Sequence, residues 1–298
     1  MGYRKPSVTT RAYLESQPLP NHGNTYTVIP HARVIDQTLR MLNDSGFRVT
    51  NETYRCNMNA QVAQGIYHIV PLINKDRKVM EESELGMMFA WTNSYDKSTR
   101  FQCSIGAYVL TTGINMCTGE LSFARKHTGS ADADIHAQIS SQIKNAEVTF
   151  RTIIDDRDFL NTTMVSKTEQ GKLLGTLYCD LDILDNTQMS MIKDSIKAGE
   201  TVSSAWTFYN YVSNALRITH PRTWLKDMRA FHNFITQHVK SPTTTQTEVV
   251  TTTTFNPYDK GQELELDTTD WLEEPNTVEL DMVQNRVENL LRVQPTQR

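Results

Sequence analysis

The sequence predicts an α+β protein, in which an antiparallel β-meander with flanking helices is followed by a helical C-terminal half and a mobile acidic tail. Three observations support this prediction. Alternating and β-branched runs dominate the first half, apolar residues at spacings of three and four dominate residues 131–240, and threonines and acids dominate the end. With 298 residues, the chain is long enough to bury a sizeable core.

Changes in composition divide the chain into four segments. Residues 1–24 mix Pro, Ser, Thr and Gly without periodicity, which predicts a flexible arm. Residues 25–130 form the β-rich half of one core domain, and residues 131–240 form its helical half. Residues 241–298 begin with a threonine-rich run and continue with acids, which predicts a linker and an interaction tail.

The β-rich half begins with a helix. After Pro30, apolar residues recur at helical spacing and stop before Gly46, which is typical of a helix end. The runs 47–57, 65–72 and 86–91 are rich in β-forming residues and predict three strands.

A second group of strands follows. The run 100–105 alternates apolar and polar side chains, which predicts a strand with one buried face. Gly106 then indicates a bulge or a close approach of two backbones. Gly113 marks a turn, and residues 121–127 predict one more strand.

The helical half begins after Ser130. Acids near the start and apolar residues at helical spacing predict one long helix that extends to about residue 153. Further helical patterns cover residues 169–178, 188–198, 202–216 and 222–239.

Two motifs carry a resemblance to a known family. Within residues 91–130, the turn NSYD (93–96) is followed by GAYV (106–109) and by the cluster RKH (125–127). A helix with the pattern W-x-x-Y-N (206–210) comes later. In these motifs the chain resembles the phage/plasmid-like protein family of unknown function, over about half of its length. The resemblance implies an accessory protein of a phage or mobile element.

The sequence lacks the common catalytic motifs. There is no P-loop, dinucleotide-binding, zinc-protease or nucleophile-elbow motif, and the four cysteines form no CxxC pair. Ser94, Asp96 and His127 have the chemistry of a hydrolytic trio, but we favour a structural turn formed by Asn93, Ser94 and Asp96. We therefore expect a protein that is not an enzyme and that needs no metal and no cofactor.

Charge is distributed unevenly along the chain. Residues 241–298 hold 11 acids and 4 bases, a net charge of −7. The whole chain has 34 acids and 30 bases, so residues 1–240 hold 23 acids and 26 bases, a net charge of +3. A mildly basic body permits contact with phosphate without requiring it.

The basic residues of the β-rich half suggest a nucleic-acid interface. Tyr54, Tyr95 and Tyr108 are interleaved with them, and cations along a backbone with rings for stacking suit sequence-independent binding of single strands. The alternative is an ordinary solvated sheet face. The predicted contact residues are Arg48, Arg55, Lys97, Arg100, Arg125, Lys126 and His127.

These features predict that the protein binds or anneals single-stranded DNA without a cofactor. The rival prediction is a non-enzymatic antagonist of a host defence or repair complex, whose acidic tail imitates DNA phosphate. The tail would also suit recruitment of a host replication protein, and a homo-oligomer is a further expectation. No run approaches the roughly 18 apolar residues of a membrane span, so we expect no membrane contact and a location in the cytoplasm of the bacterial host.

Overall fold

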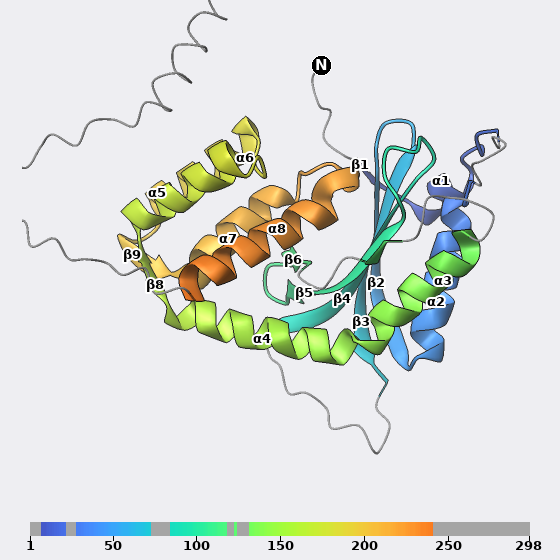
Figure 1. Ribbon diagram of the computed structural model, residues 1–298, viewed down its shortest axis with the longest axis horizontal. Helices are drawn as coiled ribbons and strands as arrows, with labels where there is room; N and C mark the ends of the chain where they lie inside the picture. Colours follow the sequence, from blue (N-terminus) through green and yellow to red (C-terminus); the bar gives the residue numbers. More distant parts are fainter. Residues whose placement is uncertain (1–6, 22–27, 73–83, 118–121, 124–130, 241–298) are drawn as a thin grey trace, which may run out of the picture. The chain divides into compact units, whose positions relative to one another are not determined.

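A seven-stranded antiparallel sheet lies at the centre of the fold (Figure 1). Six strands follow one another in sequence order, and the seventh, β7, pairs with β5. The strands are β1 (Ser7–Thr9), β2 (Phe47–Cys56), β3 (Val62–Pro71), β4 (Leu85–Ser94), β5 (Gln102–Val109), β6 (Asn115–Met116) and β7 (Ser122–Phe123). This arrangement confirms the predicted α+β class with an antiparallel meander.

The computed structural model describes residues 7–21, 28–72, 84–117, 122–123 and 131–240. Its helices are α1 (Arg11–Glu15), α2 (His31–Asp44), α3 (Ala131–Lys144), α4 (Ala146–Thr162), α5 (Lys167–Gly175), the π-helix η1 (Thr176–Asp180), α6 (Asn186–Ala198), α7 (Ala205–Leu216) and α8 (Pro221–Lys240). A separate two-stranded sheet pairs β8 (Met164–Ser166) with β9 (Val202–Ser204). No helix among these residues is long and apolar enough to cross a membrane.

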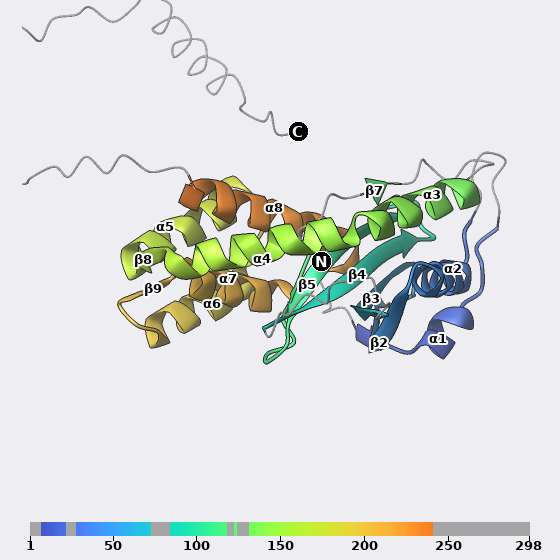
Figure 2. The ribbon, with the colours of Figure 1, turned by 90° about the horizontal axis from the view of Figure 1, so that it is seen from below.

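Helices cover the sheet on both sides. In Figures 1 and 2, α2 and α3 lie on one side of β2–β5, and α7 and α8 lie on the other. Contacts agree with this view, since α2 packs on β2, α3 on β5, and α8 on β3 and β4. Helix α4 runs from the β5 edge towards α7, and α5 and α6 lie beyond α7.

Helix α2 forms as the sequence predicts. Its apolar side chains Val34, Ile35 and Leu42 are completely buried on one face. The helix ends before Gly46, whose φ of 81° lies in the left-handed region that glycine adopts at low cost.

The central strands are buried on both faces, which corrects the prediction of a half-buried β5. Cys103 and Ile105 point to one side, and Gln102 and Ser104 on the other side are buried as well. The second face is covered because α8 packs across β3, β4 and β5. The alternation in the sequence therefore indicates which face of the strand is polar. It does not indicate whether that face is exposed to solvent.

Gly106 permits the close backbone approach that the sequence predicts. A Cβ atom at this position would lie 2.1 Å from the carbonyl oxygen of Met116 on the neighbouring strand β6. Gly113, with φ of 65°, forms the turn between β5 and β6.

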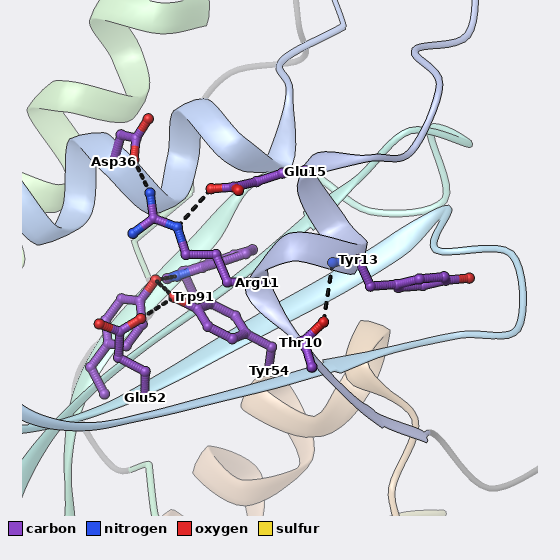
Figure 3. A network of polar contacts seen from close by, with 9 residues as sticks. Thr10, Arg11, Tyr13, Glu15, Asp36, Glu52, Tyr54 and Trp91 are labelled. Atoms are coloured by element: carbon purple, nitrogen blue, oxygen red, sulfur yellow. Dashed lines mark hydrogen bonds and ion pairs between the residues drawn. The ribbon is translucent and has the colours of Figure 1, made fainter.

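The prediction of a flexible arm over residues 1–24 is wrong for residues 7–15. Strand β1 pairs with β2, and α1 docks beside it with Leu14 buried. Figure 3 shows Arg11 bridging Glu15 at 2.6 Å and Asp36 of α2 at 2.5 Å. A three-residue strand and a five-residue helix are too short to produce a periodic pattern, so neither could be predicted from periodicity.

The helical half agrees with the prediction except at its start. The predicted long helix is two helices, α3 and α4, which meet at Asn145. Asparagine competes with helical hydrogen bonding and is common at helix starts, whereas the apolar spacing continues across the break. The later patterns correspond to α5 with η1, and to α6, α7 and α8. Most of the predicted strand 121–127 and the tail 241–298 lie outside the described residues.

Candidate nucleic-acid interface

The structure separates the predicted cations between two ends of the sheet. Arg48 pairs with Val70 near one end of β3, whereas Lys97 and Arg100 follow β4 at the opposite end, where Ser94 pairs with Val62. Eight residues of extended strand separate the two ends, which corresponds to about 26 Å. Arg48 therefore does not belong with Lys97 and Arg100.

Arg55 is a buried residue, which corrects the expectation of an exposed side chain. Only 7% of it is exposed. Its Nη2 donates a hydrogen bond to the carbonyl oxygen of Thr219, and its guanidinium lies 5.9 Å from the ring centre of Trp224. Burial and, to a smaller degree, the charge of Arg217 lower the pKa of Arg55 to about 10.

The segment between α7 and α8 meets the sheet beside Arg55. Besides the contact from Arg55 to Thr219, the hydroxyl of Thr92 on β4 donates to the carbonyl oxygen of Pro221 at 3.2 Å. These two contacts place residues 217–222 over the ends of β2 and β4. Two arginines and a histidine of this segment, Arg217, His220 and Arg222, thereby join the site.

We call the resulting cluster the basic end of the sheet. It consists of Arg55, Lys97, Arg100, Arg217 and Arg222, with His220 among them. Lys97, Arg100 and Arg217 are exposed. Arg217, His220 and Arg222 were not predicted as site residues, although the run RITHPR contains three basic or titratable residues around a proline that begins a helix.

His220 reports the electrostatics of the basic end. Burial lowers its pKa most, and the charges of Arg222 and Arg55 lower it further, while Asp96 opposes them. Its Nδ1 accepts a hydrogen bond from the backbone N–H of Arg222 at 3.1 Å, so the imidazole is neutral and caps the start of α8. The charges of Arg55 and Arg222 therefore act on His220, as that of Arg217 acts on Arg55.

The turn between β4 and β5 is held by its own side chains. The Ser94 hydroxyl donates to the carbonyl oxygen of Thr99 at 2.7 Å, and Asp96 accepts from the backbone N–H of Ser98 at 2.9 Å. Asn93 is buried in β4 and donates to the carbonyl oxygen of Ile29 at 3.0 Å. These contacts agree with a structural role for the three residues and shape the loop that carries Lys97.

A row of buried polar side chains leads inward from Arg55. Strand pairing aligns Arg55, Gln64, Thr92 and Gln102 across β2, β3, β4 and β5 on the face that α8 covers. Gln64 is completely buried, and neither its amide nitrogen nor its amide oxygen has a hydrogen-bond partner among the described residues. The indole N–H of Trp224 is likewise buried with no partner in the described ranges. Because an unpaired buried polar group costs free energy, these side chains lower the stability of the folded protein.

The tyrosines expected to stack on bases are engaged with other side chains, Tyr54 and Tyr95 in buried positions and Tyr108 in a partly exposed one. Tyr54 donates to Glu52 at 2.5 Å, as Figure 3 shows, and is buried. Tyr95 is buried and stacks on His31 with ring centres 3.8 Å apart. Tyr108 stacks on His68 at 3.6 Å. The prediction of a stacking surface built from these three rings is therefore wrong.

The remaining predicted contacts, Arg125, Lys126 and His127, lie outside the described residues. Within the described part of the chain, no group of three or more His, Cys, Asp or Glu side chains is arranged to hold a metal ion. Comparison with protein-family models, with curated proteins and with solved structures finds no match to this chain.

Proposed function

We propose that the protein binds single-stranded DNA through the phosphates of its backbone at the basic end, and that it promotes annealing as an accessory protein of a phage or mobile element. The proposal rests on the burial of the Arg55 side chain. A buried arginine is rare without a carboxylate partner, and Arg55 has none among the described residues. An anionic ligand would supply the missing charge.

Phosphate suits the basic end better than a carboxylate on a protein partner does. The cations come from β2, the β4–β5 turn and the α7–α8 segment, so they are spread over several elements at this end of the sheet. A chain of phosphates offers charges at regular intervals, so successive phosphates can meet cations from different elements. Arginine in particular recognises phosphate oxygens with a planar pair of donors.

The buried rings favour annealing over sequestration of the strand. Proteins that store single strands usually stack bases on exposed aromatic side chains. At the basic end, the rings of Tyr95 and Trp224 are buried, with exposures of 4% and 1%. A strand held by its phosphates keeps its bases free to pair with a complement.

A salt-titrated binding assay tests the proposal. Fluorescence anisotropy with labelled single-stranded and double-stranded DNA should show binding of single strands, with a log-log salt slope of about −3 for four to five phosphate contacts. Mixing complementary strands with the protein should speed duplex formation. Absence of single-strand binding at low salt would contradict the proposal.

The charge of residues 241–298 supports the second candidate, a protein-binding antagonist. With a net charge of −7, this segment has the character needed to occupy a basic site on a host nuclease or replication protein. Removing residues 241–298 separates the two candidates. Loss of a host-protein interaction, in a chain that never binds DNA, would favour the antagonist.

A further inference from the structure

We infer that the junction of α7 and α8 is a seat for one phosphate group of the bound strand, formed by Arg55, Arg217, His220 and Arg222. This inference rests on the proposed function and names its central contact. Arg55 on β2 donates to the carbonyl oxygen of Thr219, in the segment between α7 and α8 that carries Arg217 and His220. The backbone N–H of Arg222 donates to the ring of His220. In agreement with these contacts, the charge of Arg217 acts on Arg55, and the charges of Arg222 and Arg55 act on His220. The ligand class is a phosphate monoester or diester.

Arg55 has unused hydrogen-bonding capacity at this junction. A guanidinium has five N–H groups, and within the described residues the only acceptor for Arg55 is the carbonyl oxygen of Thr219. The side chain is held from below by the Trp224 ring and from one side by that carbonyl group. Its orientation is therefore fixed before any ligand arrives, which lowers the entropic cost of binding.

His220 adds a directed donor. Because Nδ1 accepts the N–H of Arg222, the ring proton of the neutral imidazole is on Nε2. The groups around the imidazole are Arg222 on α8, Arg55 on β2 and Asp96 on the β4–β5 turn. Three cationic or donor groups thus gather near one carboxylate that is already bound to the backbone of Ser98.

The start of α8 contributes its dipole and not its N–H groups. Pro221 has no N–H, Arg222 donates to the His220 ring, and Thr223 and Trp224 donate to the carbonyl oxygen of His220. A bound phosphate would consequently depend on side chains, so substitutions report on the seat directly. On the same face, the indole N–H of Trp224 and the Gln64 amide have no hydrogen-bond partner within the part of the chain that the structure describes.

Inorganic phosphate is the first probe. At matched ionic strength, phosphate should raise the melting temperature of the full chain more than chloride does, by about 3 °C at ten times its Kd. It should also compete with a labelled oligothymidylate. Arg217→Ala with Arg222→Ala should weaken the phosphate effect and the oligonucleotide affinity about tenfold.

Arg55→Lys tests the role of the arginine fork, since lysine keeps the charge but loses the planar donors. We expect it to reduce phosphate-specific stabilisation and to leave the general salt slope close to that of the parent. Arg48→Lys is the matched control, because Arg48 is an exposed arginine of the same strand at the other end of the sheet. If Arg55→Lys does not fold, the Arg217 and Arg222 variants carry the test.

The NMR titration of His220 gives a readout that a structural role would not produce. A phosphate in the seat should raise the pKa of His220 by about one unit, because a nearby anion favours imidazolium. An unchanged pKa, together with phosphate and chloride effects of equal size, would overturn the seat even if the protein binds DNA. Phosphate-specific stabilisation without DNA binding would instead uphold the seat and contradict the proposed function.

Discussion

At the residue scale, buried polar groups give the protein a pH-dependent stability. His31 is completely buried at the start of α2, with Nε2 2.9 Å from the carbonyl oxygen of Ala60 and Nδ1 3.0 Å from the Asn93 amide nitrogen. Neutral imidazole satisfies both contacts, with Nε2 donating and Nδ1 accepting. Burial lowers the pKa of His31 to about 4, and its hydrogen bond to Ala60 partly opposes this shift.

We predict that His31 makes the protein less stable as the pH falls from 6.5 to about 4. In this window the unfolded chain binds a proton that the folded protein excludes, and the loss reaches about 3 kcal/mol. Chemical denaturation at several pH values measures it. His31→Gln should remove this contribution. An unaltered pH dependence in a folded His31→Gln variant would contradict the prediction.

Asp227 should act in the opposite direction. Burial raises its pKa from 3.8 to about 6, so the folded protein binds a proton more readily than the unfolded chain does. The protonated Asp227 therefore stabilises the folded protein at low pH, and this stabilisation is lost as the pH rises towards 6. Asp227→Asn should therefore steepen the loss of stability on acidification, and the same denaturation series checks it.

Gly106→Ala should destabilise the protein by about 2 kcal/mol or more, because the added Cβ would clash with the backbone of β6. Gly171→Ala is the matched control, since a Cβ there meets no atom within 4 Å. Thermal unfolding of both variants measures the difference. Equal melting temperatures would show that β5 and β6 do not approach as described.

At the scale of elements, the sequence predicted what depends on local periodicity. Helix α2 and strands β2 to β5 have long patterns, and each was located to within a few residues. The sequence could not indicate that α8 would cover the second face of the sheet, because that depends on segments far apart in the chain. Arg55 was therefore predicted as exposed, although α8 buries it.

A β-bulge shows the same limit. In a regular strand, Arg48 and Arg55 would point to opposite faces, since their positions differ by seven, an odd number. The register shifts between Val49 and Asn51, so both arginines pair with residues of the same face of β3, Val70 and Gln64. The site residues Arg217 and Arg222 were missed because only tertiary contacts bring them to β2.

The docking of α1 gives a prediction at this scale. Leu14→Ala should cost about 2–4 kcal/mol, because Leu14 is 1% exposed and part of the main core. Leu19→Ala, at a side chain that is 46% exposed, should have almost no effect. Urea denaturation compares them. Equal stabilities would mean that residues 11–15 are not part of the cooperative fold.

At the scale of the whole molecule, charge is divided between the body and residues 241–298. If the body binds DNA as proposed, a tethered acidic segment at high effective concentration would compete with the DNA. Truncation after Lys240 should strengthen binding of single strands at low salt, with a gain that shrinks as salt screens charges over about 8 Å. Binding assays on both chains check this. A truncated chain with weaker or equal affinity at low salt would contradict the competition.

The central claim is that DNA phosphates contact the basic end. The most direct test is the log-log salt slope of single-strand affinity for the parent, for Arg217→Ala with Arg222→Ala, and for Arg48→Ala. We predict that the double variant reduces the magnitude of the slope by about 1.4, at about 0.7 for each lost phosphate contact, whereas Arg48→Ala leaves it unchanged. An unchanged slope in a folded double variant, or an equal reduction in Arg48→Ala, would contradict the claim.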